Sequence, residues 1–263
     1  MTYQIAIPSY KRYEILKTQT LPTLDNLKTD RDKIHIFVAN EEEAERYKEV
    51  IGSNYRIVVG QRGISTQRKY IHNYFADNER VVSFDDDVME MYEKGETKIQ
   101  PITYTLNDIV KRGYEVTEKH GARLWGVNPN SNNFFLKDEL SVGLRYITAT
   151  IMGSYGKEWI FTDPERRMTN TGEDAHSSLR AFVKYGAVVR FEYICFKTNW
   201  FAEGGNRTCV QEDGQTREER HLEELTWVQS RFADLCKLQV HKDTGISSLR
   251  FKSKTIAREP RWT

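Results

Sequence analysis

The chain has 263 residues, a formal net charge of +1 and 38% hydrophobic residues, which fits one large domain or two small ones. The balanced charge indicates no particular class of partner, and no apolar run is as long as a membrane-spanning helix. The N-terminus lacks a secretion-signal pattern, and the three cysteines are odd in number and in no metal-binding spacing. We therefore expect reduced thiols, a cytoplasmic location and no membrane partner.

The first ninety residues alternate between apolar runs and helix-like segments. Four short strands rich in β-branched residues are expected at residues 3–10, 34–40, 55–60 and 81–84. Helices are expected from about Tyr13, from Glu41 to a stop at Gly52, and after Gly63. This alternation is typical of a parallel sheet with right-handed crossovers. It predicts an α/β fold whose residues 1–95 form a Rossmann-type nucleotide-binding half.

The pattern changes after residue 95. The periodicity predicts helices at 104–120, from 171 and at 221–238, and strands at 123–128, 146–153 and 187–196. The mixed order indicates an α+β portion packed on the first half, so one domain covers residues 1–205, with 96–205 as its second half. A final helix and a basic tail over 206–263 would pack on the same domain. A glycine loop at 201–206 is of the kind that closes over ligands.

Three consecutive carboxylates, Asp85, Asp86 and Asp87, follow the fourth expected strand. Adjacent like charges repel one another and lose hydration at a strand end, so a neutralising partner is expected. Mg²⁺ and Mn²⁺ prefer carboxylate oxygens, and ligands of α/β sheets bind beyond the carboxyl ends of strands. The triplet predicts a divalent metal site. A solvated acidic turn is the alternative for the triplet taken alone.

A second acidic pair, Glu173 and Asp174, follows Gly172 at the start of an expected helix. Acids are common caps at helix starts, so capping alone would account for them. Asp163 is a reserve acid candidate, although Asp-Pro is also an ordinary turn pair. Three histidines could complete a metal shell, and none has a distinguishing spacing: His176, His221 and His241.

Taken together, these motifs resemble the GT-A-type glycosyltransferases over residues 3–205. The likeness rests on Gly-Glu-Asp at 172–174 and on four further runs: Ile-Pro-Ser-Tyr-Lys-Arg at 7–12, Gly-Ile-Ser-Thr-Gln-Arg at 63–68, Ser-Phe-Asp-Asp-Asp at 83–87 and Leu-Trp-Gly-Val-Asn-Pro at 124–129. More narrowly, the chain resembles the phage branch of the TET/JBP-associated glycosyltransferases, which glycosylate hydroxymethylated pyrimidines in DNA. The resemblance implies a mixed sheet flanked by helices. Fold alone does not fix the acceptor.

The resemblance also implies roles on the donor side. A UDP-sugar would be the donor, and Mn²⁺ or Mg²⁺ would bridge its diphosphate. Asp87 and Asp85 would hold the metal, Asp85 would also meet the ribose, and Asp86 would support them. The end of the first strand and the residues after it would frame the nucleotide base: Pro8, Ser9, Tyr10 and Arg12.

Other expected roles depend on where single side chains point. Arg68, one turn into its helix, would reach the diphosphate with its planar fork, with an exposed helix charge as the alternative. Asp174 would act as general base and Glu173 would orient the acceptor, which implies inversion at the anomeric carbon. Trp125 and Gly153 would face the cleft and contact the ligand. A core tryptophan beside a tight turn is the alternative.

The leading hypothesis is sugar transfer to 5-hydroxymethylcytosine or hydroxymethyluracil in phage DNA, which protects that DNA from host nucleases. An Asn- and Phe-rich loop at 130–135 and the tail at 237–263, with seven Lys or Arg against two acids, form the expected acceptor surface. A glycan, protein or lipid acceptor is an alternative within the same enzyme class. A non-catalytic nucleotide- or DNA-binding module and a metal-dependent nucleotidyltransferase are alternatives from other classes. The sugar and the oligomeric state stay open.

Overall fold

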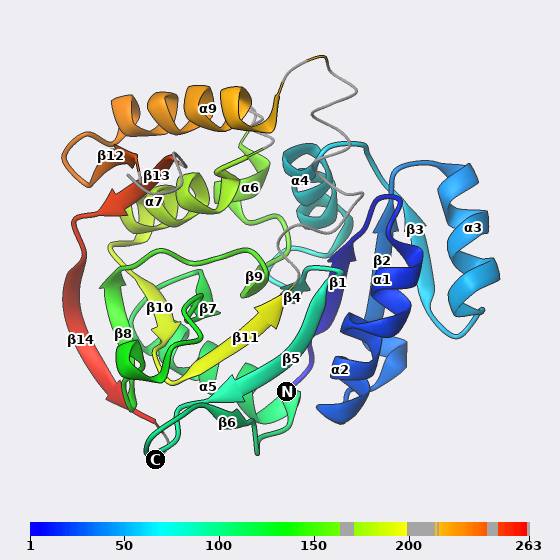
Figure 1. Cartoon of the computed structure of the whole chain (residues 1–263), viewed down its shortest axis with the longest axis horizontal. Helices are drawn as coiled ribbons and strands as arrows, with labels where there is room; N and C mark the ends of the chain where they lie inside the picture. The colour runs from blue at the N-terminus through cyan, green and yellow to red at the C-terminus, as the bar shows by residue number, and fades with distance from the viewer. Residues whose placement is uncertain (164–170, 199–213, 215, 241–246, 262–263) are drawn as a thin grey trace.

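The computed structural model describes residues 1–163, 171–198, 214, 216–240 and 247–261. Within these residues, nine strands form one large mixed sheet (Figure 1). In spatial order they are β14 (Lys254–Pro260), β8 (Glu139–Leu144), β10 (Val188–Phe191), β7 (Trp125–Val127), β9 (Ile151–Tyr155), β4 (Arg80–Phe84), β1 (Gln4–Pro8), β2 (Ile34–Val38) and β3 (Arg56–Val59). The sheet therefore combines the first strand of the chain with the last one described.

Helices cover both faces of this sheet. The helices of the described residues are α1 (Tyr13–Thr18), α2 (Thr20–Asn26), α3 (Glu41–Ile51), α4 (Ile64–Tyr74), α5 (Leu106–Lys119), α6 (Trp159–Thr162), α7 (Glu173–Tyr185) and α9 (Arg217–Arg231), with short 3-10 turns η1 (Arg31–Lys33) and η2 (Asn133–Phe135). The predicted α/β fold, a mixed sheet flanked by helices, is confirmed.

The first half of the sheet is parallel, as the sequence predicts. β1 pairs with β2 and β4, and β2 pairs with β3, all in parallel register. Side chains alternate between the two faces. Ile5 and Ile7 join the core cluster of α1, α2, α3 and α5, whereas Ala6 packs with Ile71 and Phe75 beneath α4. α3 ends at Gly52, as the sequence predicts, and begins at an Asn40 cap that the sequence analysis did not include.

Strands from the second half of the chain join the same sheet. β9 pairs antiparallel with both β4 and β7, and β10 pairs parallel with β7. β4, β7 and β10 therefore run in one direction, and their carboxyl ends lie at the same edge. α5 packs on one face, while α6 and α7 contribute to a separate apolar cluster on the other. The Asp triplet follows β4 at this shared edge.

Two predicted strands differ from the structure. Residues 187–196 form β10 and then β11 (Ile194–Thr198), which leaves the large sheet and pairs with β5 (Val88–Glu93), itself paired with β6 (Gln100–Pro101). A continuous apolar run does not reveal where a strand changes sheets, because both sheets bury it. The strand predicted at 146–153 begins at residue 151, and residues 145–150 pass over Gly126, whose added Cβ would lie 2.6 Å from Ile147 Cγ2.

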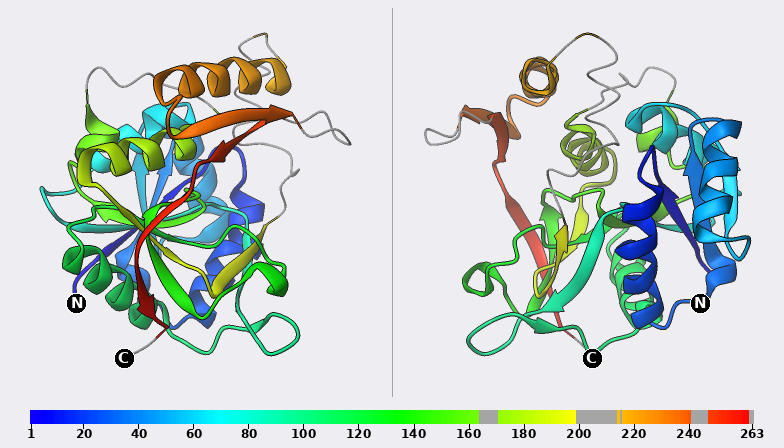
Figure 2. Two further views of the ribbon diagram at one scale, coloured as in Figure 1. Left: turned by 90° about the vertical axis from the view of Figure 1, so that its left-hand side faces the viewer. Right: turned by 45° about the vertical axis from the view of Figure 1, so that its right-hand side comes forward.

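The C-terminal region also differs. α9 starts at a capping box between Thr216 and Glu219 and ends at Arg231, so the helix predicted to continue to residue 238 is wrong at that end. β12 (Cys236–Val240) and β13 (Ser247–Phe251) form a hairpin instead. Its apolar face joins α7 and α9 in one cluster, and β14 closes the edge of the large sheet (Figure 2).

The glycine loop predicted at 201–206 lies outside the described residues. Within the described part of the chain, every helix is too short or too polar to span a lipid bilayer.

Candidate functional site

The Asp triplet occupies the turn between β4 and β5, where backbone contacts hold it from two sides. The Asp85 amide donates to the Thr150 carbonyl at 2.9 Å. The Thr20 hydroxyl of α2 donates to the Asp85 carbonyl at 2.8 Å and accepts from the Val88 amide at 2.9 Å. The turn is therefore fixed by α2 on one side and by the segment before β9 on the other.

Residues after β1 contact the triplet directly. The Ser9 hydroxyl donates to Asp86 Oδ2 at 2.6 Å, and Arg12 Nη1 donates to Asp86 Oδ1 at 3.1 Å and Asp87 Oδ2 at 3.2 Å. The Tyr47 hydroxyl of α3 lies 2.6 Å from Ser9 Oγ. Because parallel β1 and β4 end side by side, the Ser9–Arg12 segment and the triplet meet at one edge. Ser9 and Arg12 thus hold the triplet in addition to any contact with a nucleotide.

The triplet is electrostatically strained. Burial, together with the charges of Asp85 and Asp86, raises the pKa of Asp87 to about 7. Burial also raises the pKa of Asp86, although Arg12 and Ser9 oppose this effect. A divalent cation would relieve the repulsion that Arg12 alone does not remove.

The donor set fits a cation that is shared with a ligand. Among the described residues, no group of three or more His, Cys, Asp or Glu side chains is arranged to hold a metal. Mg²⁺ is commonly bound by one or two carboxylates together with substrate phosphates and water, rather than by a cage of protein ligands. In the described contacts, hydrogen bonds to Asp85 and Asp87 use one oxygen of each carboxylate. These two residues fit such a shared site.

Arg68 lies between the two acidic groups. It is 2% exposed, so the alternative of an exposed helix charge is wrong. Its Nη2 donates to Asp85 Oδ1 at 3.0 Å and to the Ala149 carbonyl at 3.4 Å, and its Nε lies 3.7 Å from Glu173 Oε1. Its Nε and Nη1 are buried without a hydrogen-bond partner among the described residues. A buried donor left without a partner costs roughly 1–3 kcal/mol, so a bound anion at Nη1 would stabilise this arrangement.

The acidic pair begins α7, and Asp174 does not act as a simple cap. Asp174 Oδ2 accepts from the Tyr146 hydroxyl at 2.9 Å and from the Ala149 amide at 3.3 Å. Burial and the charge of Asp174 raise the pKa of Glu173 to about 8. The pair therefore faces the segment before β9 and, through Arg68, the Asp triplet.

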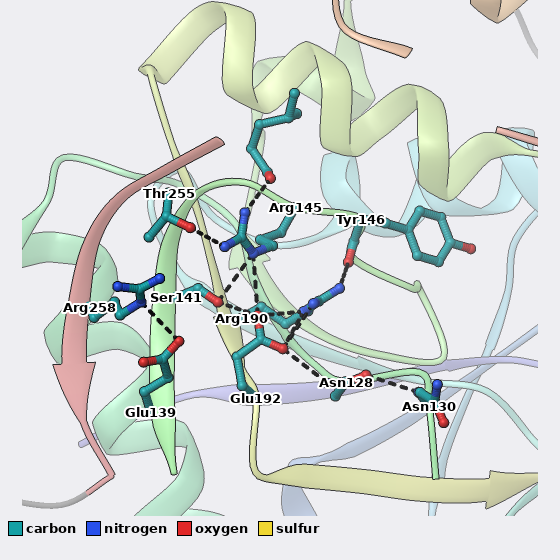
Figure 3. A network of polar contacts seen from close by, with 11 residues as sticks. Asn128, Asn130, Glu139, Ser141, Arg145, Tyr146, Arg190, Glu192, Thr255 and Arg258 are labelled. Atoms are coloured by element: carbon teal, nitrogen blue, oxygen red, sulfur yellow. Dashed lines mark hydrogen bonds and ion pairs between the residues drawn. The ribbon is translucent and has the colours of Figure 1, made fainter. Parts of the chain in front are cut away.

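A buried polar network holds the backbone of this segment (Figure 3). Glu192, 4% exposed, accepts from Arg190 Nη2 at 2.8 Å, from Asn128 Nδ2 at 3.0 Å and from Arg145 Nε at 3.3 Å. Arg190 Nη1 in turn donates to the Tyr146 carbonyl at 3.3 Å. Sequence reasoning missed Tyr146, Arg190 and Glu192, because no local pattern indicates that they meet.

The expectation for Trp125 and Gly153 is wrong. Trp125 is fully buried, and its ring packs edge-on against Tyr114 and Phe191 with centroids 5.6 and 5.7 Å apart. A Cβ at Gly153 would lie 2.0 Å from Trp125 Cε2. The glycine makes room for the indole of the core, and not for a sugar.

The remaining candidates lie in other surroundings. Asp163 pairs with Arg180 at 2.7 Å, and His221 Nε2 lies 3.0 Å from the Ser247 carbonyl. The His176 ring packs on the rings of Trp227 and Phe232. We assign no metal-binding role to His176 or His221, and His241 lies outside the described residues. Pro8 is buried at the end of β1, and Tyr10 is half-buried.

Comparisons with known proteins identify the fold. No protein-family model and no curated sequence matches the chain. Glucosyl-3-phosphoglycerate synthase from Mycobacterium tuberculosis in complex with phosphoglyceric acid aligns with a TM-score of 0.55 and 10% identity, over 99% of this chain and 89% of that one. The same enzyme with Mn²⁺ and UDP-glucose aligns at 0.53 and 9% identity, with coverages of 99% and 89%.

A mannosyltransferase from Pyrobaculum calidifontis in complex with GDP-Man and Mn²⁺ gives a TM-score of 0.52 and 10% identity. That alignment covers 86% of this chain and 65% of the mannosyltransferase. At such low identities, the similarity concerns the fold. This chain has the α/β fold of the GT-A glycosyltransferases.

Proposed function

We propose that this protein is a glycosyltransferase that moves a sugar from a UDP-sugar to an acceptor hydroxyl with the help of Mn²⁺ or Mg²⁺. One observation carries the proposal: buried Arg68 contacts Asp85 of the triplet and lies beside Glu173 of the acidic pair at the start of α7. Donor-side and acceptor-side carboxylates are thus neighbours. Solved proteins of the same fold are in complex with Mn²⁺ and UDP-glucose or GDP-Man, which supports a metal and a nucleotide-sugar donor, and the UDP carrier in the first case.

On the donor side, Asp87 and Asp85 would hold the metal, and Asp86 would keep its contacts with Ser9 and Arg12. The metal would stabilise the negative charge that develops on the departing diphosphate. Arg68 Nη1, buried and without a described partner, would donate to a diphosphate oxygen. We assign the donor to residues 1–95, with Pro8, Ser9, Tyr10 and Arg12 around its base.

On the acceptor side, Asp174 would remove the proton of the attacking hydroxyl. Its Oδ2 is held by Tyr146 and Ala149, and the described contacts leave Oδ1 for the acceptor. The acceptor oxygen would bond to the anomeric carbon as the bond from that carbon to the diphosphate breaks, and the hydroxyl proton would pass to Asp174. Attack opposite the leaving group gives inversion. Glu173 would orient the acceptor, which residues 96–205 would bind.

For the acceptor itself, we propose 5-hydroxymethylcytosine or hydroxymethyluracil in phage DNA. The motif resemblance supports this choice. So does the surface next to Asn130, where Phe134 and Phe135 are 86% and 55% exposed. Exposed aromatic rings are typical stacking partners of bases taken out of a duplex. Glycosylated DNA would resist host nucleases.

UDP release tests the proposal. Wild-type protein would be incubated with several UDP-sugars, with Mn²⁺, Mg²⁺ or EDTA, and with either hydroxymethylated or unmodified DNA. We expect UDP release that requires both a metal and the hydroxymethyl group, and an added mass on the DNA equal to one sugar. Metal-dependent release that is indifferent to DNA would retain the enzyme class and overturn the DNA acceptor. No release with any UDP-sugar would overturn the proposed transfer from a UDP-sugar.

A further inference from the structure

A buried carboxylate, Glu224, lies between α9 and the start of α7 and takes no part in the transfer step described above. It is 1% exposed and lies on the face of α9 that also carries the buried Leu225 and Val228. Glu is almost never buried to this degree unless hydrogen-bond donors surround it. The donors that reach Glu224 therefore indicate its role.

Thr171 supplies two of the donors that reach Glu224. The backbone N–H and the hydroxyl of Thr171 both donate to Glu224 Oε2, at 2.6 and 2.7 Å. Thr171 precedes Gly172, the residue at which α7 is capped. Glu224 thus holds the chain immediately before the helix that carries Glu173 and Asp174.

α9 fixes the start of α7 in two further ways. Gly172 has a left-handed φ of 69°, and a Cβ there would lie 2.8 Å from Leu225 Cδ2. One turn further on, the His176 ring packs on Trp227 with centroids 5.0 Å apart. Gly172 supplies no side-chain cap to α7. α9 therefore helps to fix the position of the first turn of α7, which has no local capping side chain.

We propose that Glu224 is a positioning residue that sets the place of Asp174 through Thr171. This inference rests on the proposed function, because it takes Asp174 as the base. Only Gly172 and Glu173 lie between Thr171 and Asp174, so a shift at Thr171 moves the carboxylate of Asp174 away from Tyr146 and Ala149. Glu224 itself does not contact the reacting atoms. Its effect is on the orientation of the base.

The test uses the full chain and three substitutions in α9. Glu224→Ala removes the acceptor of both Thr171 donors, whereas Glu224→Gln retains one oxygen that can accept them. Glu218→Gln, at an exposed position of the same helix, is the matched control. Thr171→Val removes only the hydroxyl donor and keeps the backbone N–H, so it weakens the same contact by a smaller change.

We expect Glu224→Ala to lower kcat for transfer by about 10- to 100-fold, while KM for the UDP-sugar changes less than about twofold. Thr171→Val should lower kcat by a smaller factor. Glu224→Gln should restore most of the rate, and Glu218→Gln should match wild type. Thermal melting of each variant, with assays run well below its midpoint, separates this effect from unfolding.

Three results would overturn the positioning role. One is an unchanged kcat in both Glu224→Ala and Thr171→Val. Another is a rise in the donor KM that accounts for the whole loss of kcat/KM, which would mean that Glu224 affects donor binding and not the orientation of the base. A kcat loss that Glu224→Gln fails to restore would also count against it, because the acceptor oxygen would then not be the feature that matters.

A readout independent of activity separates this inference from the proposed function. Hydrogen exchange of the amides at 171–176 should accelerate in Glu224→Ala and stay close to wild type in Glu224→Gln and Glu218→Gln. If wild-type protein transfers no sugar, the proposed function fails, whereas this exchange pattern still decides whether Glu224 fixes the start of α7. If wild type is active and exchange is unchanged in Glu224→Ala, only the positioning role fails.

Discussion

The Tyr146 hydroxyl donates a hydrogen bond of 2.9 Å to Asp174 Oδ2. Burial, followed by the charge of Asp174, raises the pKa of Tyr146 well above its ordinary value, so the hydroxyl stays protonated and remains the donor. The backbone of Tyr146 is tied through Arg190 to the buried Glu192 (Figure 3). The proposed base is thus held by a residue that is itself held by a network beneath it.

Tyr146→Phe tests this relationship. The substitution removes one donor from Asp174 Oδ2 and keeps the ring, so the carboxylate loses orientation while the Ala149 amide still holds it. We expect kcat for transfer to fall by about tenfold, with KM for the UDP-sugar unchanged. Steady-state kinetics measures both constants. Tyr70→Phe, at a half-buried position on α4, is the control, and equal effects of the two substitutions would contradict the assignment.

Asp87→Asn should abolish metal-dependent donor binding. The amide keeps the shape of the side chain and loses the charge that would attract the cation, so the gain in UDP affinity on adding Mn²⁺ should disappear. Calorimetric titration of UDP with and without Mn²⁺ measures this gain. Asp77→Asn, at an exposed position before β4, should behave as wild type. Equal Mn²⁺ dependence in Asp87→Asn and wild type would remove Asp87 from the metal site.

Asp174→Asn should separate binding from chemistry. The side chain still accepts from Tyr146 or Ala149 but takes up no proton, so we expect transfer to fall by about 10²- to 10⁴-fold. The affinity for UDP with Mn²⁺ should stay at the wild-type value, because the donor contacts lie on the other side of Arg68. Normal turnover in this variant would exclude Asp174 as the base.

Stability in the absence of metal should depend on pH. The folded-state pKa values of Asp87 and Glu173 are raised to about 7 and about 8, above the ordinary carboxyl range. The folded protein therefore binds more protons than the unfolded chain between these values and about pH 4. The stabilising contribution of these two groups is complete below about pH 4 and is lost as the pH rises through 7 to 8.

Urea unfolding of metal-free protein measures this contribution. We expect the free energy of unfolding to fall between pH 5.5 and 8.5 more steeply in wild type than in Glu173→Gln, because glutamine has no proton to release. In wild type, saturating Mn²⁺ with UDP should make the free energy of unfolding depend less on pH, because the bound cation favours ionised Asp87. Parallel slopes for wild type and Glu173→Gln in metal-free buffer would contradict the raised pKa of Glu173.

Gly153→Ala tests the correction for Trp125. The added methyl would enter the space of the indole, so we expect the free energy of unfolding to fall by about 1–3 kcal/mol. Because neither residue would contact a ligand, the donor KM should stay unchanged in assays below the melting midpoint. A change in KM without a loss of stability would return Gly153 to the binding site.

The amino-acid sequence alone predicts part of the fold and the positions of the acidic motifs. The alternation of apolar runs with helix-like segments over the first ninety residues predicts parallel β1, β2, β3 and β4, because the periodicity of each element is local. The position of Asp85 to Asp87 after β4 follows from the same pattern, since parallel strands bring their carboxyl ends to one edge. The Gly-Glu-Asp helix start is likewise visible as residues 172–174.

Only the tertiary structure decided the rest. Tyr146 and Asp174 are 28 residues apart, Arg68 and Asp85 are 17 apart, and Thr171 and Glu224 are 53 apart. No local period encodes such contacts, because they form when separate elements pack. The same is true of Trp125: its sequence neighbours suit a strand end, yet the glycines at 113 and 153 leave room for its ring in the core. The local sequence pattern predicts on which strand end or helix each acid lies, whereas the packing of separate elements determines which residues orient it.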